Sequence, residues 1–151
     1  MRALERLKST GQMLFHGDLK PENLVVKPQG TVVMIDPAAA QPSGPVPATL
    51  HYNPLLLRES KADVMAIGIT LYEILTGTLP FEQVPWEYAG NPAGGETVRL
   101  SLSYFLSYVP ARELNPNAPP ELERIIYRCI TIPEYGLEHL RDDLVSFLRK
   151  P

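Results

Sequence analysis

The longest apolar pattern in the chain lies between Ala62 and Thr76, in the sequence ADVMAIGITLYEILT. Apolar residues recur there at helical spacing and also fill most of the positions between, which predicts a helix buried on most of its sides. Gly77 and Pro80 follow and are typical signals for the end of a helix. We therefore expect a central helix at about residues 62–76.

Two further helices are expected at about residues 119–149. The first begins at the prolines of PPELERIIYRCI, because proline suits the first helical turn. Its apolar face carries Leu122, Ile125, Ile126 and Cys129. The second helix, LEHLRDDLVSFLR, has apolar residues at the same spacing, namely Leu137, Leu140, Leu144, Phe147 and Leu148. Weaker patterns favour the end of a helix near Leu4 and Leu7, and another helix over residues 97–109.

Two short β-prone runs, NLVV and TVVMI, lie on either side of KPQG, whose proline and glycine favour a turn. Together they predict a small hairpin. Residues 36–54 follow with five prolines, and we expect them to form a long irregular loop of the kind that is usually functional or mobile. The predicted fold class is therefore mainly α, or α+β, with one small hairpin and the length of a single domain.

Composition narrows the class of protein. Apolar residues make up 44% of the chain and charged residues 21%, which is typical of a globular domain. The net charge is -3 and the 14 basic residues are scattered, so we expect neither nucleic acid nor a membrane as a partner. The single cysteine, Cys129, falls in an apolar helical pattern and is expected to be a buried structural thiol. No signal-peptide core or spanning segment is visible, which predicts a cytoplasmic location.

The candidate chemistry lies in HGDLKPENLVV, residues 16–26, and in the aspartate that follows the second β-prone run. Phosphoryl transfer needs a carboxylate for the attacking hydroxyl, a cation near the phosphate and oxygen ligands for Mg²⁺. Asp18 and Lys20 suit the first two roles, and Asn23 with Asp36 suits the third. A hairpin would bring Asn23 and Asp36 to the same end. A simpler reading is that Asp18 and Asn23 only stabilise a turn through backbone hydrogen bonds.

These residues carry a specific resemblance. HGDLKPEN resembles the catalytic loop of eukaryotic-type Ser/Thr protein kinases, and Asp36 falls where that family has its metal-binding aspartate. TLHYNP resembles the end of the family's activation loop, and DVMAIGITLYEILTGTLPF resembles its central buried helix. The last two helices match its final helices as well. From about Leu4 to the end, the chain is therefore similar to the C-terminal lobe of a protein kinase.

The resemblance implies a role for each matching residue. Asp18 would be the catalytic base, and Lys20 would contact the γ-phosphate. Asn23 and Asp36 would bind Mg²⁺, and Val25 would lie under the adenine of ATP. Thr49 would face the substrate hydroxyl. Asp63 would accept hydrogen bonds from the backbone around His16 and Gly17, although SKAD also predicts a capping box with Ser60 as the N-cap.

The chain also departs from the family pattern. No glycine-rich loop or strand lysine precedes residue 16, so the N-terminal lobe is expected to be absent. Gly17 stands where the family has an arginine, and DPA (Asp36–Ala38) replaces Asp-Phe-Gly. Leu55 and Gly136 stand where the family has a buried glutamate–arginine pair. Loss of both partners can be nearly neutral, whereas loss of one leaves a buried charge.

Three functions remain open on this evidence. The first is a truncated kinase or pseudokinase lobe that acts as a binding or regulatory module and is inactive alone. The second is an active Ser/Thr kinase whose N-terminal lobe comes in trans or from the parent protein. The third is a small-molecule phosphotransferase of the aminoglycoside or fructosamine kinase type, which HGD and IDPA also resemble.

A partner is expected on the surface that the N-terminal lobe would cover. Leu14, Phe15 and Val25 are the candidate residues of this surface. Exposed apolar patches usually mark an interaction site, so we expect either a protein partner or self-association there.

Overall fold

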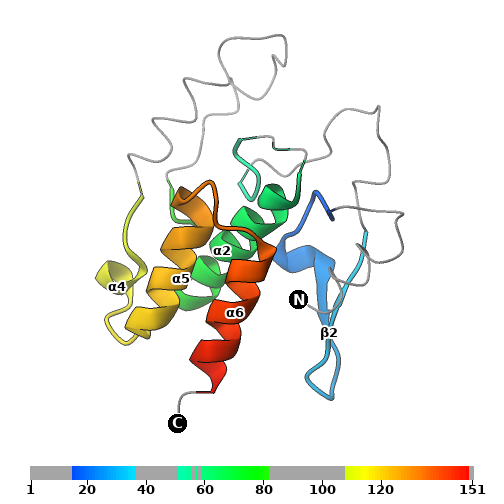
Figure 1. The fold of residues 1–151 in the computed structure, drawn as a ribbon. Coiled ribbons are helices and arrows are strands. Elements are labelled where there is room, and N and C mark those ends of the chain that lie inside the picture. The colour runs from blue at the N-terminus through cyan, green and yellow to red at the C-terminus, as the bar shows by residue number, and fades with distance from the viewer. Residues whose placement is uncertain (1–14, 37–50, 56, 58, 82–107, 150–151) are drawn as a thin grey trace.

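The computed structural model describes residues 15–36, 51–55, 57, 59–81 and 108–149 (Figure 1). The predicted fold class is confirmed, since these residues form helices and one two-stranded antiparallel hairpin. The predicted helices near Leu4 and over most of residues 97–109, and most of the predicted loop at 36–54, lie outside the described residues. Within the described residues, no helix has the length and apolarity needed to cross a bilayer.

The hairpin follows a short 3-10 turn, η1, at Pro21–Asn23. Strand β1 (Leu24–Val26) pairs with β2 (Val32–Met34) in a register that sets Leu24 opposite Met34. The connecting turn closes through Gly30, which has a φ of 76° and whose N–H donates to the Lys27 carbonyl at 2.8 Å. Glycine reaches this left-handed conformation without a steric penalty, which explains the KPQG signal.

The central helix, α2, extends over Ser60–Thr76 and begins two residues earlier than the sequence pattern predicts. It is buried on most sides along its first three turns, as the apolar pattern predicts, and ends at Gly77 with a φ of 73°. The Gly77 N–H donates to the Glu73 carbonyl at 2.8 Å, a common way for a helix to end at glycine.

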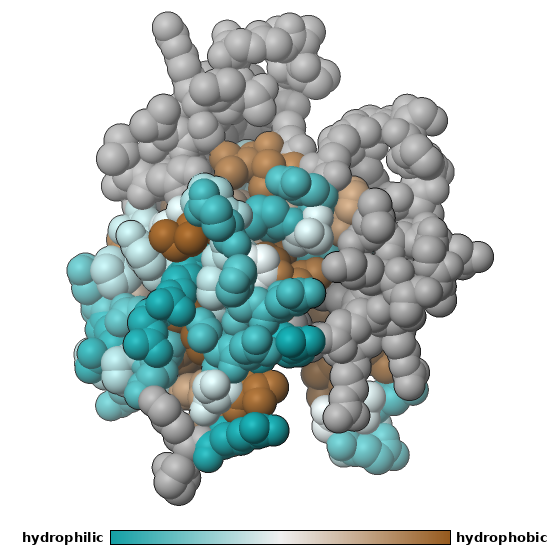
Figure 2. Space-filling model, in the orientation of Figure 1, coloured by the Kyte–Doolittle hydropathy of each residue, from teal (hydrophilic) through white to brown (hydrophobic). Residues whose placement is uncertain are grey.

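Three helices complete the described part of the chain, namely α4 (Ala111–Leu114), α5 (Pro120–Thr131) and α6 (Leu137–Leu148). In Figure 1, α5 and α6 lie side by side in front of α2. Figure 2 shows mostly hydrophilic side chains over α5 and α6, as expected for helices whose apolar faces turn inward.

Among the described elements, helices α2 and α5 share the most extensive contact. Gly68 lies against Cys129 and Ile130, and a methyl group added at Gly68 would overlap with the Cβ of Cys129. Cys129 is fully buried, as the sequence predicts, and burial raises the pKa of its thiol to about 12. The backbones of α2 and α5 approach so closely because residue 68 has no side chain.

Gly68→Ala should lower the free energy of unfolding by about 1–3 kcal/mol, because α2 and α5 would have to move apart. Thermal or urea unfolding measures this loss. Gly136→Ala is the matched control, since a methyl group there meets nothing within 4 Å and should cost less than half as much. Equal losses for the two variants would show that the α2–α5 contact is not tight.

Candidate functional site

A buried carboxylate anchors the loop that carries the candidate chemistry. Asp63, in the first turn of α2, is 0% exposed. Its Oδ2 accepts a hydrogen bond from the His16 N–H at 2.6 Å, and its Oδ1 accepts one from the Gly17 N–H at 2.9 Å. Burial raises the pKa of Asp63, and the two N–H donors partly offset that effect because they stabilise the charged form. The loop is thus attached to a helix that is buried on most sides along its first three turns.

The capping box predicted from SKAD is not present. Helix α2 has Glu59 at its N-cap position without a side-chain cap hydrogen bond, and Ser60 is its first helical residue. The local pattern suggested a cap because serine followed by an acid is a common helix start. In the folded chain, the Asp63 carboxylate instead serves a loop that is 46 and 47 residues away in sequence.

His16 connects the loop to the end of the hairpin. Its ring is 1% exposed, its Nδ1 accepts from the Asp18 N–H at 3.4 Å and its Nε2 lies 3.0 Å from the Ile35 carbonyl. Nε2 therefore carries the proton and donates to Ile35, because Nδ1 acts as the acceptor. Gly17 has a φ of 86°, so an arginine at this position would adopt a conformation costing about 1–2 kcal/mol.

The structure brings together three of the four candidate polar residues. Lys20 Nζ lies 3.0 Å from Asp18 Oδ2, with the two side chains 23% and 16% exposed. The side-chain nitrogen of Asn23 donates to the Asp18 carbonyl at 2.8 Å and lies 3.5 Å from Asp18 Oδ2. A carboxylate, an ammonium group and a carboxamide thus lie close together, and the first two are partly exposed to solvent.

Asp36 reaches the same end of the hairpin through the strand register. The Ile35 N–H donates to the Asn23 carbonyl at 3.0 Å, and Asp36 is the next residue. Asp36 is exposed and has a φ of 58°, a left-handed conformation that aspartate tolerates better than most residues. Such backbone outliers are concentrated at active sites and ligand-binding sites.

The fit to Mg²⁺ rests on the donor set at this hairpin end. Within the described residues, no group of three or more His, Cys, Asp or Glu side chains is placed to hold a metal ion. A Mg²⁺ site of the nucleotide type needs fewer protein ligands, since phosphate oxygens and waters supply the rest. The Ile35–Asn23 hydrogen bond brings Asn23 and Asp36 to this end of the hairpin, and both side chains carry oxygen atoms of the kind that Mg²⁺ prefers.

Val25 and Thr49 are the other two predicted site residues outside this polar group. Val25, predicted to lie under adenine, is 44% exposed on β1. Its neighbours Val26 and Val32 are 68% and 50% exposed, so the hairpin presents an apolar surface to solvent. Thr49, predicted to face the substrate hydroxyl, lies outside the described residues, as does Leu14. Phe15 is partly buried.

Sequence reasoning did not identify Tyr52 and Glu73 as a pair. The Tyr52 hydroxyl donates to Glu73 Oε2 at 2.6 Å, which ties the segment before Pro54 to α2. Burial first, and then this bond, raises the pKa of Tyr52 well above its ordinary value. The two residues are 21 positions apart and belong to no local motif, so only the folded chain reveals their contact.

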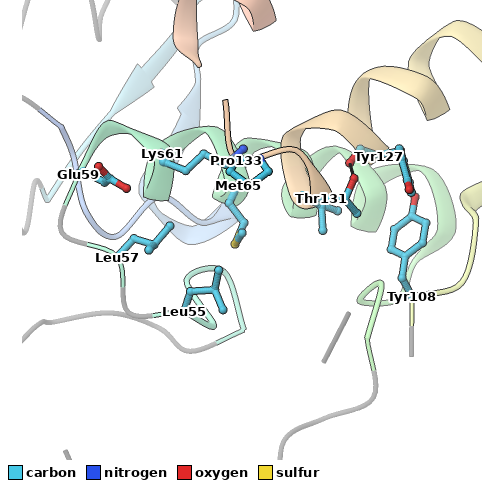
Figure 3. Close-up of a pocket in the computed structure, with 10 residues that line it drawn as sticks. Leu55, Leu57, Glu59, Lys61, Met65, Tyr108, Tyr127, Thr131 and Pro133 are labelled. Atoms are coloured by element: carbon cyan, nitrogen blue, oxygen red, sulfur yellow. Dashed lines mark hydrogen bonds between the residues drawn. The ribbon is translucent and has the colours of Figure 1, made fainter. Parts of the chain in front are cut away.

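Uncharged residues occupy the two positions at which the kinase family has a buried glutamate–arginine pair. Leu55 is partly buried and packs against the main core cluster, and Gly136 is the N-cap of α6. A cavity of about 490 Å³ opens beside Leu55 (Figure 3). Its described lining comes from the segment around Leu57, from α2 and α5, and from Tyr108 and Pro133, and includes no residue of the loop at 16–26.

Curated proteins with similar sequences are protein kinases. The chain is 32% identical over 143 residues to "Probable serine/threonine-protein kinase PknB" of Lactococcus lactis, covering 85% of this chain and 21% of that protein. It is 28% identical to "Serine/threonine-protein kinase PrkC" of Bacillus subtilis, covering 90% of this chain and 22% of that protein.

A further relative is named for tyrosine rather than for serine and threonine. "Tyrosine-protein kinase MasK" of Myxococcus xanthus is 28% identical to the chain, covering 97% of this chain and 24% of that protein. The chain thus spans about a fifth to a quarter of the length of these relatives. No family model matches the sequence.

Asp63 should make stability depend on pH. Because its pKa is raised in the folded chain, its contribution to stability is complete below the unfolded value of about 4 and is lost as the pH rises through the folded pKa. The stability of the wild type relative to Asp63→Asn should therefore fall as the pH rises from about 3 to 7.

Urea unfolding at a series of pH values measures this difference. Thr70→Val on the same helix removes a buried hydroxyl without changing an ionisable group, so its difference from the wild type should not vary with pH. A wild-type advantage over Asp63→Asn that grows with pH would contradict the direction of the shift.

Proposed function

This chain is related to the serine/threonine protein kinases through their C-terminal lobe, and we propose that it supplies the acceptor and metal half of a phosphotransfer site. The observation that carries the proposal is the meeting of Asp18, Lys20 and Asn23 on a loop held by Asp63. A turn that was only a remnant would not need a buried carboxylate to fix its backbone.

Each side chain has a defined task in this proposal. Asp18 accepts the proton of the acceptor hydroxyl as the oxygen of that hydroxyl attacks the γ-phosphorus of ATP and ADP leaves. Lys20, 3.0 Å from Asp18, places a positive charge beside the transferred phosphoryl group. Mg²⁺, when bound, neutralises charge on the phosphates. Asn23 and Asp36 are the residues that would hold it.

Catalysis should require a second, nucleotide-covering lobe. The described residues include neither a glycine-rich loop that would cover the phosphates nor a strand lysine that would contact them. Phosphoryl transfer depends on positioning, so one wall of a site provides little rate on its own. We propose that a partner, or another part of the same protein, supplies this lobe.

The hairpin is the surface proposed for that lobe. Val26 and Val32 lie opposite each other in the strand register and are 68% and 50% exposed, whereas Val25, 44% exposed, faces the other side of the hairpin. Exposed apolar side chains that share a face in this way usually mark an interaction site. The partner is therefore a protein that presents an apolar surface to the hairpin, rather than nucleic acid.

The names of the relatives favour a protein acceptor over a small molecule, because all of those compared are protein kinases. The names differ in the amino acid whose hydroxyl is phosphorylated, since one relative is named a tyrosine kinase. A serine or threonine hydroxyl is proposed here, because the L. lactis and B. subtilis relatives are both named serine/threonine-protein kinases.

Mg²⁺-dependent nucleotide binding should depend on Asp36. Titration of Mg-ATP into the chain, followed by calorimetry, should give a binding signal that disappears without magnesium and falls at least tenfold in affinity for Asp36→Asn. Asp142→Asn is the control, because this carboxylate is exposed on α6 and pairs only with Arg141 among the described contacts. Equal affinities for the wild type and Asp36→Asn would remove Asp36 from the proposed site.

Phosphotransfer should appear when a second lobe is added and should depend on Asp18. We expect transfer from radiolabelled ATP to casein when the chain is mixed with the separately expressed N-terminal lobe of the L. lactis relative. Asp18→Asn should lower the rate about 10²- to 10⁴-fold, the usual contribution of a general base. Asp142→Asn should leave it unchanged.

Three other outcomes would decide against parts of this proposal. Transfer by the chain alone would overturn the need for a second lobe. If Val26→Lys and the wild type needed the same concentration of the second lobe for half-maximal rate, the hairpin would not be the surface that binds this lobe. Absence of transfer in the mixture, together with absence of Mg-ATP binding, would reduce the chain to a binding module without a nucleotide site.

A further inference from the structure

Lys61 makes an unusual set of contacts at the end of α5. Its ammonium group donates to the carbonyl oxygens of Cys129 at 3.0 Å, Ile132 at 2.6 Å and Tyr135 at 3.2 Å. A lysine ammonium has three N–H donors, so all three are used. The side chain thereby joins α2 to the connection between α5 and α6, about seventy residues later in the sequence.

The sequence explains why the Cys129 carbonyl needs a donor from outside its own helix. The carbonyl of Cys129 lies in the last turn of α5, where the next helical N–H would come from residue 133. Residue 133 is proline, which has no N–H to give. A positive charge is also favourable at a helix C-terminus. In Figure 3 the Lys61 side chain extends along the wall of the cavity towards Pro133.

Lys61 and Asp63 act on opposite sides of the same helical turn. Residues two apart in an α-helix are rotated by about 200° and do not face the same neighbour. Lys61 accordingly reaches the α5–α6 connection, whereas Asp63 reaches the backbone of His16 and Gly17. The first turn of α2 is therefore fixed on one side to the end of α5 and on the other side to the loop that carries Asp18.

We propose that Lys61 is a positioning residue for the loop at 16–18 and acts through Asp63. Its three hydrogen bonds fix the first turn of α2, and that turn fixes the carboxylate that holds the amides of His16 and Gly17. A displacement of about 1 Å at a reacting group can cost about 10²-fold in rate, so small shifts of this turn matter. The consequence for phosphotransfer rests on the proposed function, but the mechanical coupling does not.

Amide hydrogen exchange tests the coupling without nucleotide. In Lys61→Met, which keeps the length of the side chain but removes its charge and donors, exchange at His16 and Gly17 should become at least tenfold faster. These rates are compared with exchange at Ile69, in the buried middle of α2, so that a general loss of stability is subtracted. Lys61→Arg keeps the charge and should restore most of the protection.

Tyr135→Phe is the matched control. It removes the hydroxyl that donates to Asp143 Oδ2 at 2.8 Å in the same connection, and it leaves the backbone carbonyl that contacts Lys61. Relative exchange at His16 and Gly17 should change less than threefold in this variant. An equal increase in Tyr135→Phe and Lys61→Met would show that Lys61 acts only through overall stability and would overturn the proposal.

Lys61→Gln is a second variant in case Lys61→Met does not fold. Unchanged relative exchange at His16 and Gly17 in the variant that folds would overturn the proposal. In the mixture with a second lobe, Lys61→Met should lower kcat more than it raises KM for ATP. A changed exchange pattern without any phosphotransfer in the wild type would retain the coupling and refute the proposed function instead.

Discussion

The candidate site depends on one buried carboxylate. The Asp63 carboxylate accepts hydrogen bonds from the backbone N–H groups of His16 and Gly17, the two residues that precede Asp18. Burial of an ionised carboxylate is costly, and two backbone donors at short distance offset part of that cost. The same bonds satisfy two backbone N–H groups that have no partner in a strand or helix. The same interaction therefore eases the burial of both partners, and it fixes the backbone that precedes Asp18 against the first turn of α2.

The rigidity of this anchor comes from the packing of α2. Gly68 lets α5 approach closely, and Lys61 joins the first turn of α2 to the carbonyls at the end of α5. Polar side chains that act in catalysis are positioned best when rigid elements support them. Here the support runs from α5 to α2 and from there, through Asp63, to the loop. The hairpin is attached to the same loop by the bond between His16 and Ile35.

The departures from the kinase pattern are compatible with this framework. Gly17 occupies a left-handed conformation that would strain an arginine. Leu55 packs into the core in place of a charged residue, and Gly136 begins α6 without a charge. Replacing both members of a buried pair avoids leaving one uncompensated charge. Close to Gly136, Lys61 provides a positive charge whose partners are carbonyl oxygens rather than a carboxylate.

The sequence by itself determined the described helices and the hairpin, and it supplied the residues from which the candidate site is proposed. Apolar spacing was sufficient for α2, α5 and α6, and the turn at KPQG was sufficient for the hairpin, because both signals depend on neighbours within about four residues. The HGDLKPEN motif identified Asp18, Lys20 and Asn23. The tertiary structure alone decided that Asp63 does not complete a capping box, that Tyr52 bonds Glu73 and that Lys61 reaches α5. These contacts join residues 21 to 74 positions apart, and a local pattern contains no information on which distant backbone atoms packing will leave without a partner.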